Sequence, residues 1–245
     1  VSLYRLIEIN LELQKWELVD KFSKELLKRF PENEYAAFAQ FHEAEAALYQ
    51  NQVESAQAAL LKLAAKDRLE TLSQEPWYPR VWVLLAETYF RQKKYKEVAE
   101  TVDRFRTWDP DSPFLYQAEE VLGRSLKNQA KFDEARKVFQ QIIDSEHGRR
   151  TATAAKCQFL LAETLMIQEK FKEALLAYLQ VDIQYKFPEW QAPALYQAAM
   201  CHEALNEWPQ AQKTYQDYLK RFPEHELVPQ AKERLKAVTA RISKN

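Results

Sequence analysis

The sequence predicts an all-α fold in which about six helix-turn-helix repeats stack as a solenoid and one helix caps the C-terminal end. Only 2 of the 245 residues are glycine, whereas a typical chain of this length has roughly seventeen, so glycine-dependent β-hairpin turns are scarcely available. A four-residue pattern recurs along the chain: an aromatic residue, two mostly polar residues, and a small or β-branched residue. Apolar residues follow most copies at helical spacing.

The composition excludes several classes of function. Gly123 and Gly148 are too few and too far apart for either a P-loop or a dinucleotide-binding loop. The formal net charge is −1, so no basic excess indicates a nucleic-acid partner. The sequence has no apolar run near the ~20 residues of a membrane helix, so direct membrane insertion is not expected, and residues 1–9 do not resemble a signal peptide. Because the chain begins at Val1 rather than methionine, we expect it to be a piece or a processed form of a longer protein.

The recurring pattern defines six repeats at intervals of 37 to 42 residues. In chain order the copies are WELV at 16–19, a weaker VESA at 53–56, YKEV at 95–98, FDEA at 132–135, FKEA at 171–174 and WPQA at 208–211.

Three further positions repeat around the last residue of each copy. Twelve residues before it lie Ile7, Ala44, Ala86, Gly123, Ala162 and Ala199. Four residues after it lie Ser23, Leu60, Val102, Phe139, Tyr178 and Tyr215, and seven residues after it lie Leu26, Leu63, Phe105, Ile142, Val181 and Tyr218. This spacing describes one face of a helix, so each unit predicts two antiparallel helices, with the small residue of the first allowing the second to pack closely. Several units end at a proline, which cannot continue a helix: Pro31, Pro110, Pro188 and Pro223.

The predicted repeats together form a single solenoid over residues 1–245. Their approximate ranges are 1–36, 37–78, 79–115, 116–154, 155–191 and 192–224, followed by a capping helix at 226–243 with Val228, Ala231, Leu235, Val238 and Ile242 on one stripe. A solenoid needs such a cap because its last repeat has no neighbour. Residues 65–79 fall outside the period, and we expect an extended helix there, followed by a proline-bounded loop that carries Trp77 and Tyr78.

No catalytic or metal-binding pattern is found. His42 and His202 are each followed by glutamate but lack the second histidine of a zinc-protease helix, and His202 is expected to be a hydrogen-bonded interface residue. Cys157 and Cys201 are expected to be small buried residues that do not form a disulfide with each other. We therefore predict a non-enzymatic protein with no cofactor and no metal site.

The repeats resemble the tetratricopeptide repeat (TPR) family over residues 3 to 224. The third unit carries the resemblance through Trp82, Leu85, Ala86, Tyr89, Val98, Val102, Phe105 and Pro110, and the last unit through Leu195, Ala198, Ala199, His202, Ala211, Tyr215, Tyr218 and Pro223. The resemblance implies a right-handed α-solenoid. The intervals exceed the family's ~34 residues, which is similar to TPR proteins of the bacterial envelope and favours a periplasmic or envelope-associated location over a cytoplasmic one.

The resemblance also places the first helix of each repeat on a concave wall, where two rows of residues would be exposed. The first row is Tyr4, Phe41, Val83, Glu120, Phe159 and Tyr196, and the second is Glu8, Glu45, Glu87, Arg124, Glu163 and Met200. Aromatic anchors beside carboxylates would suit a peptide with basic and apolar residues. Equally, glutamate favours helix surfaces and the aromatic residues could pack adjacent repeats. The positions that hold a lysine, asparagine and arginine clamp for C-terminal carboxylates in some relatives carry glutamate and aromatic residues here, so that ligand is not expected.

The sequence is consistent with two functions. The first is a protein–protein interaction scaffold that binds a peptide or protein segment in its groove. The alternative is a structural or oligomerisation module of a larger, envelope-associated bacterial protein, with Trp77, Tyr78 and Trp190 at self-associating edges. No nucleic-acid partner is expected in either case.

Overall fold

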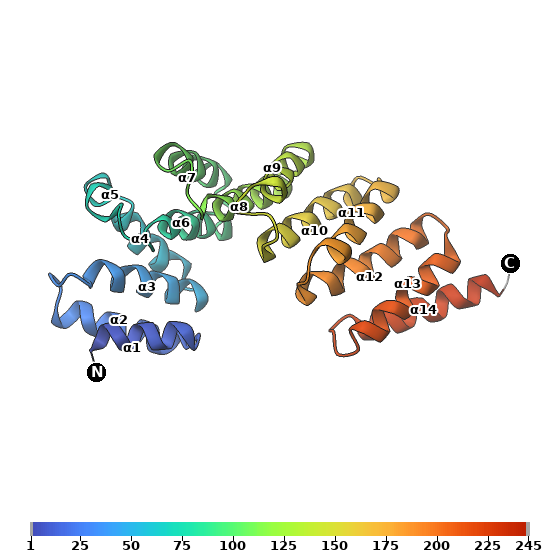
Figure 1. Ribbon diagram of the computed structural model, residues 1–245, viewed down its shortest axis with the longest axis horizontal. Helices are drawn as coiled ribbons and strands as arrows, with labels where there is room; N and C mark the ends of the chain where they lie inside the picture. The colour runs from blue at the N-terminus through green and yellow to red at the C-terminus, as the bar shows by residue number, and fades with distance from the viewer. Residues whose placement is uncertain (1, 244–245) are drawn as a thin grey trace. The chain divides into compact units, whose positions relative to one another are not determined.

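The structure is a computed structural model that describes residues 2–243. These residues form fourteen α-helices and no strand (Figure 1). The helices are α1 (Leu3–Glu12), α2 (Trp16–Arg29), α3 (Ala36–Tyr49), α4 (Val53–Leu63), α5 (Lys66–Leu72), α6 (Pro79–Arg91), α7 (Tyr95–Trp108), α8 (Leu115–Asn128), α9 (Phe132–Asp144), α10 (Ala152–Ile167), α11 (Phe171–Gln184), α12 (Pro188–Ala204), α13 (Trp208–Arg221) and α14 (Val228–Ile242). The predicted all-α class is confirmed.

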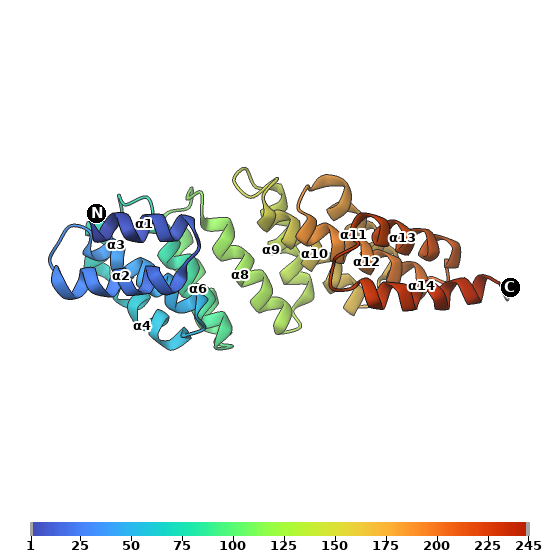
Figure 2. The same ribbon diagram turned by 90° about the horizontal axis from the view of Figure 1, so that it is seen from below.

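The chain divides between Ser125 and Leu126 into two compact units. In the first unit, α1, α2 and α3 lie side by side, and α4 packs against α3 and α6 (Figure 1). In the second unit, α11, α12, α13 and α14 pack in chain order, each against the next (Figure 2). Each helix therefore buries its apolar stripe mainly against its neighbours in sequence, as expected for a repeat array.

The four repeated positions form the cores of both units. The six residues that end the recurring pattern are each 0% exposed, and so are all six that lie four residues further on. The residues twelve before and seven after are buried as well. Burying one such side chain of valine, leucine or phenylalanine size stabilises the fold by roughly 1.5–3 kcal/mol, so these positions supply much of the driving force for folding.

The aromatic residue of the pattern covers the junction between its repeat and the next element. Trp16 stacks on Tyr49 with ring centroids 3.8 Å apart, and the guanidinium of Arg241 lies 4.6 Å from the Trp208 ring centroid. Both rings remain partly exposed. What recurs is therefore the place of the aromatic residue in the repeat, and not its complete burial.

The two helices of each repeat are joined by a turn with one residue in the left-handed region. These residues lie five positions before the last residue of each copy of the recurring pattern and have φ between 53° and 61°: Gln14, Asn51, Lys93, Ala130, Glu169 and Asn206. The following residue donates its backbone N–H to the carbonyl of the residue five positions earlier, as Lys131 does to Leu126 at 3.0 Å, which is the hydrogen bond of a Schellman motif. The turns thus obtain a conformation that suits glycine without using one.

Changing Ala130 to glycine should stabilise the protein by about 1 kcal/mol, because alanine pays a steric cost of about 1–2 kcal/mol in the left-handed region that glycine avoids. The measurement is the midpoint of urea unfolding for Ala130→Gly beside Ala58→Gly, which changes an exposed interior residue of α4 and should destabilise by a similar amount. If both variants lose stability, the turn is not strained.

Gly148, in the turn after α9, does not have a positive φ; a Cβ there would lie 2.5 Å from the Ile142 carbonyl oxygen, so glycine is needed for close approach. The structure also corrects two expectations. The segment at 65–79 is not an extension of the preceding helix, since α4 ends at Leu63 and α5 is a separate helix. Tyr78 is 0% exposed and donates its hydroxyl to the Leu63 carbonyl at 2.9 Å, so it is a core residue and not a self-associating edge.

The predicted capping helix is present as α14. Ala231 and Val238 are buried in a cluster that also contains Tyr215 and Tyr218 of α13, and Val228, Leu235 and Ile242 pack around it. Among the helices of residues 2–243, none is both long enough and apolar enough to cross a membrane.

Candidate functional site

The two predicted rows of groove residues differ widely in exposure. In the first row, Phe41 is 0% exposed and Glu120 and Tyr196 are also buried, which contradicts their expected exposure. Tyr4, Val83 and Phe159 are partly exposed. In the second row, Glu45 is buried, while the others retain some accessible surface: Glu8, Glu87, Arg124, Glu163 and Met200.

Three carboxylates of the second row are neutralised by basic residues of neighbouring repeats. In the first unit, Glu45 forms an ion pair with Arg80, and Glu87 forms one with Arg124. In the second unit, Glu163 forms one with Lys127. These pairs connect the first helices of adjacent repeats, so much of the expected acidic ladder holds the array together and is not free for a partner.

The Arg124 guanidinium interacts with carboxylates of its own helix and of the preceding repeat. Burial alone would lower the pKa of Arg124, but the Glu120 and Glu87 carboxylates outweigh that effect and raise the pKa. The same guanidinium lies 4.2 Å from the Phe90 ring centroid. Arg124 is therefore a structural residue between repeats.

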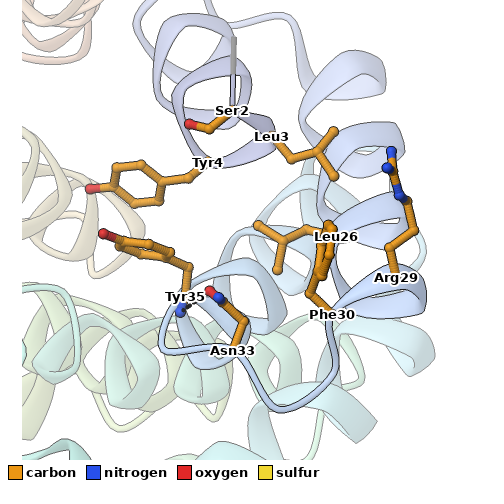
Figure 3. A pocket seen from close by; sticks show the side chains of 8 residues that line it. All are labelled: Ser2, Leu3, Tyr4, Leu26, Arg29, Phe30, Asn33 and Tyr35. Atoms are coloured by element: carbon orange, nitrogen blue, oxygen red, sulfur yellow. Dashed lines mark hydrogen bonds between the residues drawn. The ribbon is translucent and has the colours of Figure 1, made fainter.

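An open pocket lies at the start of the first unit, between α1, the end of α2 and the loop before α3 (Figure 3). Its cavity volume is about 390 Å³. The rings of Tyr4 and Tyr35 face each other with centroids 4.3 Å apart. We call this the aliphatic pocket, because leucine and phenylalanine side chains form much of its wall; it is lined by Ser2, Leu3, Tyr4, Leu26, Arg29, Phe30, Asn33 and Tyr35.

A second pocket, of about 340 Å³, shares the tyrosine pair with the first. Its walls combine four aromatic rings with two carboxylates and contain no lysine, arginine or histidine, and we call it the acidic pocket. The residues that line it are Tyr4, Glu34, Tyr35, Ala37, Phe38, Leu72, Glu75, Pro76 and Trp77.

Three elements position the rings of the acidic pocket. Tyr4 comes from the first turn of α1, and its ring lies 4.9 Å from that of Phe38 on α3. Tyr35 is fixed at the start of α3 by its backbone N–H, which donates to Asn33 Oδ1 at 3.0 Å. Trp77 belongs to the non-repeating segment after α5 and stacks on the buried Phe41 with centroids 5.1 Å apart. Phe41 thus supports the site from beneath without lining it.

The Tyr4 hydroxyl is hydrogen-bonded to Glu8, one turn further along α1. The bond between the Tyr4 hydroxyl and Glu8 is the main reason that the pKa of Tyr4 is raised and that of Glu8 is lowered, with Arg5 contributing further to Glu8. Tyr4 therefore stays protonated and Glu8 stays ionised at neutral pH. Of the twelve residues proposed from the sequence, Tyr4 lines both pockets, and Glu8 is hydrogen-bonded to it without lining either one.

Sequence reasoning did not identify Glu34, Tyr35, Phe38 and Glu75 as site residues. They lie near the loops between repeats and not at the two positions of the first helix that were examined. A signal existed, because residues 30–38 read FPENEYAAF, with three aromatic residues and two glutamates around the end of a repeat.

Three histidines have side-chain hydrogen-bond partners: His42, His202 and His225. His202 Nδ1 lies 2.7 Å from a carboxylate oxygen of Glu207. Cys157 and Cys201 are buried, as expected, and neither forms a disulfide. Burial raises the pKa of Cys201 to about 12, so its thiol is not a nucleophile at neutral pH. Within residues 2–243 no group of histidine, cysteine and acidic side chains could hold a metal ion.

Comparison with known families identifies the repeats. A model described as a tetratricopeptide repeat-like domain matches residues 2–162, and a tetratricopeptide repeat model matches residues 193–225. The chain belongs to the TPR family. TPR proteins generally mediate protein–protein interactions and are typically non-enzymatic scaffolds. No curated protein matches the sequence.

Several solved structures share the fold at low sequence identity. PilF of Pseudomonas aeruginosa is 15% identical, with a TM-score of 0.67 over 96% of this chain and 97% of that one. The apo quorum sensor NprR of B. thuringiensis is 13% identical, with a TM-score of 0.70 over 96% and 68%. YrrB, described as a TPR protein with an unusual peptide-binding site, is 18% identical, with a TM-score of 0.53 over 86% and 97%. At these identities the likeness establishes the fold and not the ligand.

Proposed function

We propose that this TPR protein is an interaction scaffold and that its first unit binds a segment of a partner protein across the aliphatic and acidic pockets. The observation that carries the proposal is the tyrosine pair, in which Tyr35 is exposed and Tyr4 partly exposed: both rings line two adjoining cavities. Buried apolar side chains elsewhere in the unit are enclosed by neighbouring helices, whereas these rings keep accessible surface. Exposed, rigid tyrosine rings supply large contact area at little entropic cost.

Neighbouring side chains of one bound segment can therefore occupy the two cavities. An apolar side chain fits the aliphatic pocket, whose wall includes Leu3, Leu26 and Phe30. The adjoining cavity has a different lining, dominated by rings and carboxylates. Two unlike pockets side by side would select a short sequence pattern and not apolar surface in general.

Alanine at Tyr35 is expected to weaken binding at least tenfold, because it removes an aromatic wall from both pockets. The probe is a fluorescein-labelled peptide selected with the full chain from a library of random 12-residue peptides, and fluorescence polarisation measures its dissociation constant. Tyr49→Ala is the matched control, since Tyr49 is an exposed tyrosine at the other end of α3.

Peptide affinity unchanged by Tyr35→Ala, or reduced as much by Tyr49→Ala, would contradict this site. The second result would indicate that the peptide binds instead in the cavity around Trp16 and Tyr49, at the turn between α1 and α2. Circular dichroism of each variant separates lost contacts from lost structure.

The alternative of an oligomerisation module has one supporting observation. Leu176 and Ile183 lie seven residues apart on α11 and are 65% and 79% exposed, so they share one face of the helix. Trp190, which the sequence proposed for this role, is partly buried against Phe159 with centroids 5.7 Å apart. Sedimentation at several concentrations distinguishes the two functions: a monomer supports the scaffold, and a tight dimer that Leu176→Glu dissociates supports the alternative.

A further inference from the structure

We infer that the acidic pocket binds an arginine side chain of the partner segment, an inference that rests on the proposed function and specifies its ligand. The pocket places four aromatic rings, those of Tyr4, Tyr35, Phe38 and Trp77, around one cavity whose lining also includes Glu34 and Glu75. Faces of aromatic rings attract cations, and carboxylates at the rim would form charge-assisted hydrogen bonds with the same group.

The two carboxylates are available for such a ligand. Within residues 2–243 the structure gives neither Glu34 nor Glu75 an ion pair, and both residues are exposed. Glu45 differs, because Arg80 already neutralises it. Arg80 also lies 5.4 Å from the Phe41 ring centroid, so the protein itself already uses an arginine between an aromatic ring and a glutamate next to this site.

The non-repeating segment makes the pocket possible. Without α5 and the following loop, a regular repeat would supply Tyr4, Tyr35 and Phe38 but neither Glu75 nor Trp77. Pro76 restricts the backbone between these two residues, so the ring and the carboxylate are presented together. The segment that breaks the period thus contributes one wall of the cavity.

The choice of arginine over lysine follows from the lining. A guanidinium is planar, stacks on aromatic rings and is more weakly hydrated than an ammonium group. An ammonium group would lose more hydration on entering a cavity with four rings. Arginine is therefore favoured where the cation must contact both rings and carboxylates.

The test uses the selected peptide in three synthetic forms, in which its arginine is kept, replaced by lysine, or replaced by citrulline, which has the same shape without the charge. Citrulline should weaken binding about tenfold, and lysine should weaken it to a smaller degree. The double variant Glu34→Gln/Glu75→Gln should weaken the arginine peptide about tenfold and the citrulline peptide much less. Glu32→Gln/Glu70→Gln is the matched control, because it removes the same charge from exposed residues outside both pockets.

The outcomes separate this inference from the proposed function. Selected peptides that lack arginine, or that bind equally well with citrulline or lysine, would overturn the inference while Tyr35→Ala still identifies the site. Equal loss in the two glutamine double variants would also overturn it, because the effect would then come from overall charge. Peptides insensitive to Tyr35→Ala would overturn the proposed function itself.

Discussion

Replacing Phe41 with alanine is expected to lower the free energy of unfolding by about 3–5 kcal/mol. The side chain is 0% exposed and contacts rings on two sides: Trp77 with centroids 5.1 Å apart and His42 with centroids 4.8 Å apart. Removing it leaves a cavity that helices on either side cannot readily fill. Chemical denaturation measures the loss, and Phe41→Leu, which keeps most of the volume, should cost less than about 1.5 kcal/mol.

The Phe41→Ala substitution should also destabilise one region of the chain and not the whole. In a repeat array each repeat contacts mainly its neighbours, so amide hydrogen exchange should accelerate in α3, α4 and α6 and remain unchanged in α12 to α14. A loss below about 1 kcal/mol, or faster exchange throughout the chain, would contradict the enclosed position of Phe41. Weaker peptide binding by this variant would then reflect the support that Phe41 gives to Trp77.

Changing Gly148 to alanine is expected to destabilise the second unit by about 1–3 kcal/mol. A Cβ atom would lie 2.5 Å from both the Ile142 carbonyl oxygen and Ser145 Oγ. The Ser145 side chain cannot simply move aside, because its hydroxyl donates to the Ile142 carbonyl and accepts the Gly148 N–H, each at 2.9 Å. The backbone oxygen would have to shift as well, at the end of α9.

Arg149→Ala is the control for this prediction, since Arg149 is an exposed neighbour in the same turn and its loss should change stability by less than about 0.5 kcal/mol. Thermal unfolding of the two variants checks the comparison. Equal stability of Gly148→Ala and the original chain would mean that the turn relaxes freely and that this glycine has no packing role.

The fold could be predicted because its core is periodic. Val98, Val102 and Phe105 lie on one helix face in sequence, and the structure buries all three. The same positions recur in each repeat, so the pattern can be recognised from the other copies even where one copy has a polar residue. Ser23 is such a residue, buried in place of an apolar side chain. Helix periodicity indicates which face of each helix is buried, and this information is enough to predict a solenoid, in which each helix packs against its neighbours in sequence.

The site could be predicted only in part, because it depends on contacts that break the period. Phe41 occupies a position that is partly exposed in other repeats, at Val83 and Phe159, but here Trp77 of the inserted segment covers it. Glu45 is neutralised by Arg80, which lies outside both rows. Tyr35 lies in the loop just before α3. A pattern of repeated positions cannot identify residues that occur once.

An NMR titration of the ¹⁵N-labelled full chain with the selected peptide decides whether the tyrosine pair and Trp77 of the first unit form a peptide-binding site. The largest chemical-shift changes are expected at the Tyr4 and Tyr35 amides and the Trp77 indole N–H. If the largest changes occur instead at Trp16 and Tyr49, or in the second unit, the peptide does not bind at the tyrosine pair.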